Sequence, residues 1–328
     1  MGEKSSKINS YGINSKRLLD TPPFYYSIYF AHKYDCDISV LNGEGIGNIV
    51  IYTRLIEELA LKKGRPLKLL TAPINPEVGI VESEEEYPIW KNNPFVKKIV
   101  DADKIDKEIM QFVNKEQDNF CQFNHFIENI CSVFGLKPRK LKPSLYLSLE
   151  EMKWAIDTLS DLPRPIICLH PSGKSSVFED SLWYFDNWVK LIKLFSNSIS
   201  FIQIGKYDYD GKELPIFQLK TTIREAMSLI WASDIFIGFD SGPSHIATAF
   251  DKPTLVLWNI LRKNPMEEPM QTGFGPASLL RWSYPQNRNL MLLGEKDDEI
   301  FSLIVDFIIE RLHSIYRYDK LPVIPHYK

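Results

Sequence analysis

The sequence predicts an α/β protein of two doubly wound, Rossmann-like domains that face a central cleft. Three observations carry this prediction. First, 328 residues are enough for two domains with separate cores. Second, apolar runs of strand length alternate with amphipathic helical patterns in both halves, which favours parallel sheets covered by helices. Third, Lys137–Pro143 contains two prolines and indicates a connection between domains.

The expected domains are residues 35–143 and residues 144–296, with an extension at 1–34 and a helix and tail at 297–328 that could pack back on the first domain. The extension is polar and Lys/Ser-rich, and an aromatic run follows at 22–30. This run either packs on the body of the protein or forms a surface for a membrane or an acceptor. We favour packing, because the aromatic residues show no amphipathic period.

The first domain is expected to begin with a strand at Asp37–Leu41, followed by a glycine-rich turn. A helix with one apolar face comes next and ends at Gly64. Further strands are expected at Leu67–Thr71 and Lys98–Val100. Residues 104–140 read as helical material whose phenylalanines most simply belong to the core.

The second domain shows the same alternation. Capping-box patterns predict helix starts at Ser148–Glu151 and Thr222–Glu225. The remaining expected elements are strands at Pro165–Leu169, Ile199–Ile204, Asp234–Gly238 and Thr254–Trp258, a helix carrying Phe185 to Phe195, and a strongly apolar helix at Asp297–Leu312.

Composition excludes several classes of function. Thirty-nine basic and 42 acidic residues give a net charge of −3, so no global field attracts nucleic acid. The four cysteines are scattered and form no Cys-x-x-Cys pair, which favours a reduced, cytoplasmic chain. We find no signal peptide and no apolar stretch long enough to span a bilayer. If the substrate is lipid-linked, we expect peripheral contact with the inner face of the membrane.

The run Phe236–Phe250 is the most informative stretch of the chain. It reads as a buried strand, an abrupt turn and a new helix, with Asp240, Ser241 and Ser244 at the junction and Gly242 and Pro243 shaping the first turn. The first amides of a helix have no internal partner and carry the positive end of its dipole, so they suit a phosphate. Asp240 can accept hydrogen bonds from sugar hydroxyls. The junction therefore predicts a site for a phosphorylated ligand, with a nucleotide sugar as the favoured class.

His245 lies one turn into the new helix. It either packs there or donates to phosphate or sugar, and we favour ligand contact because Asp240 is close in sequence. Metal ligation is disfavoured, because no second histidine or carboxylate stands at the spacing a metal site needs. We expect no essential metal and no cofactor besides the donor substrate.

A second anion-binding turn is expected at Ser172, Gly173 and Lys174, which directly follow a strand. Their amides and the ammonium group could face a diphosphate and stabilise it as a leaving group. The alternative is an ordinary solvated loop lysine.

The glycine-rich turn of the first domain, Gly43-Glu-Gly-Ile-Gly47, is followed by Asn48. Its glycines allow close approach of the backbone to a ligand. A dinucleotide-binding fingerprint does not fit, because Val50 stands where a glycine or alanine is needed. Asn48 could orient an acceptor, but an amide cannot act as a base at neutral pH. Glu44 is the candidate base, and a surface carboxylate is the equal alternative.

Three stretches carry a family resemblance: Gly43–Val50, Leu169–Lys174 followed by Trp183, and Asp240–His245. In this order they resemble the heptosyltransferase-like glycosyltransferases of family 9, over roughly residues 36–312. The resemblance implies the GT-B architecture, with the donor in the cleft at the carboxyl ends of the strands. It also implies an aspartate base where this chain has Asn48, and a lysine nearer the tryptophan where this chain has Ser181-Leu182.

The expected function is therefore that of an inverting, metal-independent glycosyltransferase. Its donor would be a nucleoside-diphosphate sugar, ADP-heptose by resemblance, and its acceptor a hydroxyl of a bacterial glycan, a lipopolysaccharide core or a glycoprotein. Family members often place an acidic residue against the ribose near Glu225, but the capping box already explains Glu225. Two alternatives stay open: a sugar-nucleotide-binding protein that has lost transfer, and a nucleotide-sugar epimerase.

Overall fold

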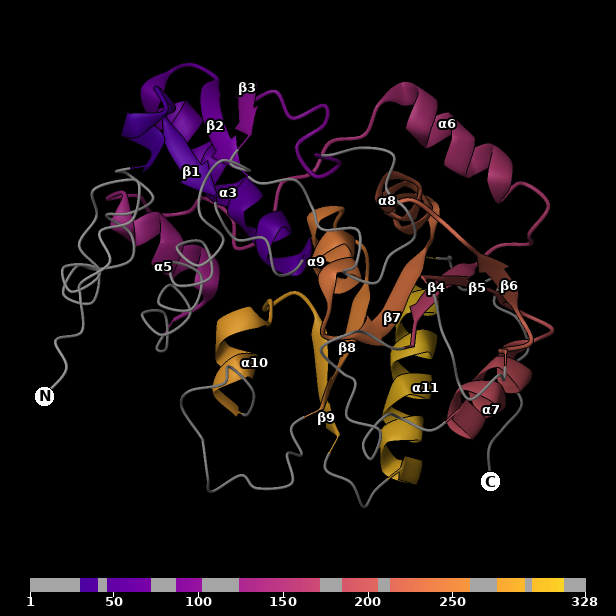
Figure 1. The fold of residues 1–328 in the computed structure, drawn as a ribbon. Coiled ribbons are helices and arrows are strands. Elements are labelled where there is room, and N and C mark those ends of the chain that lie inside the picture. The colour runs from indigo at the N-terminus through magenta and orange to yellow at the C-terminus, as the bar shows by residue number, and fades with distance from the viewer. Residues whose placement is uncertain are drawn as a thin grey trace, which may run out of the picture.

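A computed structural model describes residues 30–40, 46–71, 87–101, 124–171, 185–205, 213–259, 276–292 and 297–315. Two parallel sheets form two α/β units that lie side by side (Figure 1). The first unit contains β1 (Ile38–Val40), α3 (Ile46–Lys63), β2 (Leu67–Thr71), β3 (Val96–Asp101) and α5 (Phe126–Val133). The second contains α6 (Leu149–Thr158), β4 (Ile166–His170), α7 (Phe185–Phe195), β5 (Ser200–Ile204), β6 (Phe217–Leu219), α8 (Ile223–Ala232), β7 (Ile235–Phe239), α9 (Gly242–Ala249), β8 (Thr254–Asn259), α10 (Pro276–Trp282), β9 (Arg288–Leu292) and α11 (Asp297–Ile315).

The order of the second sheet locates its ligand-binding edge. Its strands run β6-β5-β4-β7-β8-β9, and every neighbouring pair is parallel. The chain builds outward from β4 to β6, returns to the other side of β4 at β7, and then builds outward to β9. The winding direction therefore reverses between β4 and β7. In open α/β sheets, ligands bind in the crevice at the carboxyl ends of the strands at this switch point.

Both faces of the second sheet are covered, which explains its continuous apolar strands. Ile167 and Leu169 of β4 belong to the core that α7 and α11 complete. Their neighbours Ile166 and Cys168 point to the other face, toward α8 and α9. Successive side chains of a strand alternate between faces, so this strand needs apolar residues at every position. The α/β class and the helices on both faces confirm the predicted fold.

The first unit follows the sequence prediction closely. Helix α3 buries the apolar face that includes Ile51, Leu55 and Ile56. It ends at Lys63, directly before Gly64, whose φ of +67° is in the region that favours glycine. The three described strands are parallel, in the order β1-β2-β3.

The two units share one continuous core. The cluster that contains α3 also contains buried residues of α8 and α9. Figure 1 shows α3 running toward α9, and these two helices contact each other, as do α6 and α8. The candidate site therefore lies where two packed domains meet.

The sequence left open whether the C-terminal helix and tail pack back on the first domain, and of these residues the structure describes 297–315. Helix α11 packs on the second sheet beside α7 through Ile304, Phe307 and Ile308, and not on the first domain. Helix α10 does reach the first domain, where the Trp282 ring stacks on Phe126 with centroids 4.6 Å apart. Helices α7 and α11 both contribute buried side chains to the core on this face of the second sheet.

Sequence patterns missed three elements: β6, α10 and β9. Strand β6 has only three residues, and β9 begins with Arg288 and Asn289, so neither shows the apolar run of the central strands. Both are edge strands of the sheet, where burial is partial and the pattern is weak.

Part of the N-terminal extension and most of residues 104–140 lie outside the described residues. At the end of the extension, Phe30 and Ala31 are buried, as expected if this end packs on the domain. Cys36, Cys131 and Cys168 form no disulfide, and Cys121 is not among the described residues. Within the described ranges, no helix has both the length and the apolar character that crossing a bilayer requires.

Candidate functional site

The junction between β7 and α9 lies at the switch point of the second sheet. Helix α9 begins at Gly242 with Pro243 in its first turn, where a proline sacrifices no intrahelical hydrogen bond. The Ser244 hydroxyl donates to the Ser241 carbonyl at 2.8 Å, and this bond closes the first turn. The predicted strand-turn-helix is thus confirmed, and the positive end of the α9 dipole lies directly after the carboxyl end of β7.

Ser241 connects this junction to the end of β4. Its hydroxyl donates to the Phe239 carbonyl at 3.0 Å and lies 3.2 Å from Nδ1 of His170. His170 is buried, and burial lowers its pKa to about 3, so the imidazole is neutral at physiological pH. The two chain segments that leave the switch point are therefore joined by a hydrogen bond between side chains.

Ser172, Gly173 and Lys174 follow His170 and Pro171 and lie outside the described residues. Their role in binding a diphosphate stays a prediction. The described residues add one fact that bears on it: β4 and β7 are neighbouring parallel strands, so the carboxyl ends of these two strands lie at the same edge of the sheet.

Asp240 is the carboxylate of the junction. Its side chain is 32% exposed, and burial of the remainder raises its pKa to about 7. Such a carboxyl group can both accept and donate a proton or a hydrogen bond near neutral pH. This property was not visible in the sequence, where Asp240 was expected only as an acceptor for sugar hydroxyls.

His245 lies in the first turns of α9, between Tyr284 and Asp240. Its Nδ1 lies 2.9 Å from the Tyr284 hydroxyl, and its Nε2 lies 4.0 Å from Oδ1 of Asp240. The first distance is a hydrogen bond and the second is too long for one. Burial lowers the pKa of His245 to about 3, and nearby His125 contributes in the same direction. His245 is therefore a neutral side chain, and its contact with a ligand stays a prediction.

The first domain reaches this junction through the N-terminal turn of α3. A Cβ on Gly47 would lie 2.9 Å from Cδ2 of His245, and a Cβ on Gly242 would lie 3.2 Å from Cβ of Ile46. Both distances are shorter than normal contacts, so these glycines allow the two helices to touch. Asn48, half-buried, is in the same turn of α3, which brings this predicted site residue to the junction. Glu44 lies outside the described residues, so its role as a base stays a prediction.

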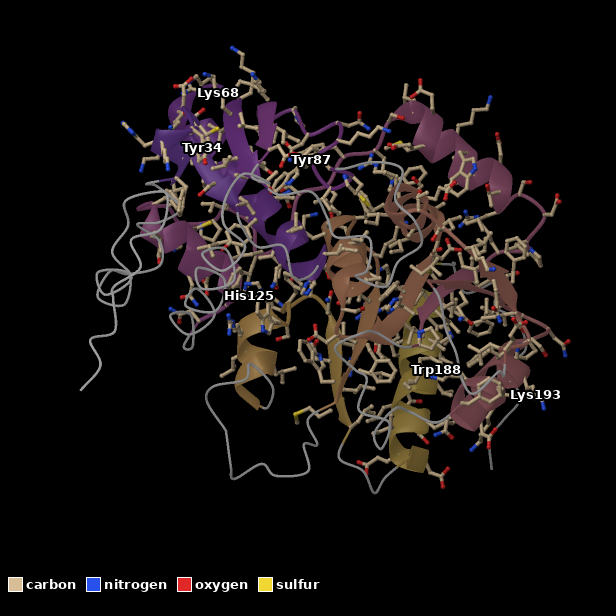
Figure 2. All side chains as sticks on the ribbon, in the orientation of Figure 1. Tyr34, Lys68, Tyr87, His125, Trp188 and Lys193 are labelled. Carbon is tan, nitrogen blue, oxygen red and sulfur yellow. The ribbon has the colours of Figure 1, made fainter. Side chains whose placement is uncertain are left out.

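Two residues near the junction were missed by sequence reasoning, namely Tyr284 and His125. Tyr284 precedes β9, and His125 caps α5 by accepting a hydrogen bond from the Ile127 amide at 3.1 Å. The rings of His125 and Tyr284 have centroids 5.0 Å apart. Figure 2 shows His125 between the first domain and the end of α10. Neither residue belongs to a recognisable motif, because the contact joins residues that are distant in the sequence.

The described residues also line a pocket of about 400 Å³, at the opposite end of α9. It includes Arg54, Arg139, Lys142 and Ala249. Three of its cations are already paired with carboxylates, as Arg54 and Arg139 contact Glu57 and Lys142 contacts an aspartate. We therefore place the candidate site at the β7–α9 junction and not in this pocket. No cluster of three His, Cys, Asp or Glu side chains suited to a metal ion occurs among the described residues.

Comparison with known proteins agrees with this location. Residues 216–267, which contain the β7–α9 junction, match glycosyltransferase family 9 (heptosyltransferase). The match covers part of the second domain, less than half of the chain. It agrees with the resemblance seen in the sequence over the part of the chain that carries the Asp240–His245 motif.

Solved structures of glycosyltransferases share the fold of this chain. ADP-heptose lipopolysaccharide heptosyltransferase II of E. coli superposes with a TM-score of 0.55 at 13% identity, over 81% of this chain and 97% of that chain. A family 9 glycosyltransferase of Veillonella parvula superposes with a TM-score of 0.57 at 11% identity, over 81% of this chain and 95% of that chain. No curated protein sequence matches the chain significantly. The two-domain GT-B fold follows from these likenesses.

Two residues within the matched region have structural roles. Glu225 caps α8 by accepting from the Thr222 amide at 2.7 Å, as the capping box predicted. Arg224 turns away from the junction and donates to Glu151 and to the carbonyl oxygens of Pro88 and Tyr146. Arg224 therefore links the two domains. Because Arg224 and Glu225 both have structural partners, neither is a candidate for contact with the nucleotide ribose.

Proposed function

We propose that this protein is an inverting, metal-independent glycosyltransferase that moves a sugar from a nucleoside-diphosphate sugar to an acceptor hydroxyl. The observation that carries the proposal is the β7–α9 junction, where a helix N-terminus, Asp240 and neutral His245 meet the first domain at the switch point of a parallel sheet. We take ADP-heptose as the first donor to test, because a likeness to an ADP-heptose enzyme supports it.

The donor diphosphate would lie at the N-terminus of α9, with Ser172, Gly173 and Lys174 on its other side. The helix dipole and the Lys174 ammonium would stabilise the negative charge that develops on the leaving nucleotide. These groups would perform the task that a divalent cation performs in other transferases, which is why we propose that no metal is needed. Asp240 would accept hydrogen bonds from the sugar hydroxyls, and Ser241, Gly242, Pro243 and Ser244 would shape the turn.

The acceptor would approach from the first domain. Its hydroxyl would attack the anomeric carbon as the bond to the diphosphate breaks, and the stereochemistry would be inverted. Asn48 would orient the acceptor, and Glu44 would take the proton, because an amide has no basic site at neutral pH. We propose a bacterial glycan, lipopolysaccharide core or glycoprotein as acceptor, met in the cytoplasm or at the inner face of the membrane.

The function is tested by incubating the full chain with ADP-, UDP- and GDP-sugars and measuring thermal shift and nucleotide release, with and without EDTA. We expect a shift with one donor class and acceptor-dependent release that EDTA does not alter. The absence of a shift with every donor would contradict the proposal. Inhibition by EDTA that added metal reverses would contradict metal independence alone.

Asn48 motivates a second candidate, a sugar-nucleotide-binding protein without transfer, and an epimerase is the third. Glu44→Gln separates the first two, because a base substitution should abolish turnover while donor binding remains. Turnover that survives in Glu44→Gln would show that Glu44 is not the base. An epimerised nucleotide sugar, or free sugar, produced without acceptor would identify the third.

A further inference from the structure

The Tyr284 hydroxyl is hydrogen-bonded to the His245 imidazole, at 2.9 Å from Nδ1. Both side chains are buried, with 2% and 5% of their surfaces exposed. Within the described ranges, no other acceptor is recorded for this hydroxyl. A buried hydroxyl without an acceptor is costly, so the hydroxyl donates to Nδ1.

A neutral imidazole that accepts at Nδ1 must carry its proton on Nε2. This assignment also suits the other side of the ring, where Nε2 lies 4.0 Å from Oδ1 of Asp240. An N–H group directed at a carboxyl oxygen is favourable, whereas a lone pair directed there is repelled. The two neighbours of His245 thus favour the same tautomer.

We propose that Tyr284 is a positioning residue for His245, holding the imidazole in the Nε2–H form and aiming this donor at the Asp240 side of the candidate site. The inference rests on the proposed function, in which an anionic or hydroxyl oxygen of the donor sugar nucleotide accepts from that N–H. The 4.0 Å gap leaves the N–H without a hydrogen bond to Asp240, so it can serve the ligand.

Surrounding groups restrict the ring and its partner. The Cα of Gly47 is close enough that a Cβ there would lie 3.3 Å from Nε2, so the first domain limits rotation of the imidazole. The His125 ring packs near Tyr284, with centroids 5.0 Å apart. Because Nδ1 of His125 accepts from the Ile127 amide, its proton is on Nε2, and this ring offers no competing acceptor to Tyr284.

The tautomer can be measured directly by long-range proton–nitrogen NMR on the full chain labelled with ¹⁵N-histidine, assigned with His245→Gln. For the wild-type protein at pH 7 we expect a His245 signal with a protonated Nε2 and a hydrogen-bonded, unprotonated Nδ1. In Tyr284→Phe we expect the Nδ1 signal to lose its hydrogen-bond shift. Tyr146→Phe is the matched control, because it removes a hydroxyl that contacts Glu57 and not His245, and its His245 signal should be unchanged.

The second measurement is the affinity of the protein for the donor sugar nucleotide. We expect Tyr284→Phe to raise the Kd for the donor about tenfold, the size of one lost hydrogen bond to a charged group, and Tyr146→Phe to leave it unchanged. A wild-type His245 protonated on Nδ1 would overturn the proposal, and so would an identical His245 spectrum in Tyr284→Phe. A wild-type protein with the expected spectrum that binds no nucleotide sugar would instead overturn the proposed function, so the two failures are distinguishable. The wild-type spectrum decides the tautomer even if Tyr284→Phe does not fold.

Discussion

Gly47 of α3 lies directly against the His245 ring of α9, so that a Cβ on Gly47 would be 2.9 Å from Cδ2 of the imidazole. The contact joins the end of the glycine-rich turn of the first domain to the β7–α9 junction of the second. The glycine therefore has a packing role between domains, in addition to any role in ligand approach.

Gly47→Ala should destabilise the protein, because neither the buried imidazole nor the helix backbone can easily move. We expect a loss of about 1–3 kcal/mol in the free energy of unfolding, the range for an overpacked core. Chemical denaturation measures it. Leu61→Ala, on the exposed side of the same helix, is the control and should change stability by less than about 0.5 kcal/mol. Equal stability of Gly47→Ala and wild type would show that the domains are not closely packed in solution.

Arg224→Met should be strongly destabilising. The guanidinium is buried and donates to Glu151 at 2.8 and 2.5 Å and to the Pro88 carbonyl at 3.0 Å. Its removal takes the buried cation from the largely buried Glu151 carboxylate and the guanidinium donor from the Pro88 carbonyl, a change that costs about 3–5 kcal/mol. The matched control is Arg288→Met, whose exposed pair with Glu310 should contribute at most about 1 kcal/mol. Similar losses for both variants would contradict this account.

Donor binding should weaken above neutral pH because of Asp240. Burial raises the pKa of Asp240 to about 7, so the carboxyl group is neutral below pH 7 and anionic above it. The Asp240 anion repels the diphosphate of the donor. Because binding is coupled to one proton, that of Asp240, the affinity changes by at most about tenfold per pH unit. Titration calorimetry with a nucleotide sugar between pH 6 and pH 8.5 measures this. Asp240→Asn should abolish the dependence and exposed Asp251→Asn should retain it; a flat wild-type profile would refute the prediction.

Asp37 should contribute to stability above acidic pH. The Arg65 guanidinium, together with Lys63 and the Lys68 amide, holds the pKa of Asp37 well below its usual value of 3.8. A depressed folded-state pKa gives stability that is present above the unfolded-state pKa and is lost as pH falls toward the folded-state value.

Asp37→Asn should therefore cost about 1–3 kcal/mol above pH 5, the range for hydrogen bonds to charged groups, and less below pH 4. Denaturation at several pH values checks both size and sign. Asp35→Asn is the control, since this side chain is 91% exposed and should have little effect at any pH. A difference between Asp37→Asn and wild type that grows on acidification would reverse the predicted sign.

The sequence alone was sufficient for the elements whose signals are local. The apolar face of α3, the caps of α6 and α8, and the buried strand before Asp240 follow from residues within one or two turns of each other. The same holds for the β7–α9 junction, because the end of the strand, the proline and the start of the helix are adjacent in the chain. The α/β class and the family resemblance rest on these local patterns.

The tertiary structure decided every contact between distant residues. Tyr284 meets His245, Gly47 meets His245, and Arg224 meets Pro88 only because the chain returns to the same place after many residues. Such contacts depend on how whole elements pack and leave no periodic trace. The pKa of Asp240 has the same origin, because the loss of water around a carboxyl group depends on everything that surrounds it and not on its neighbours in sequence.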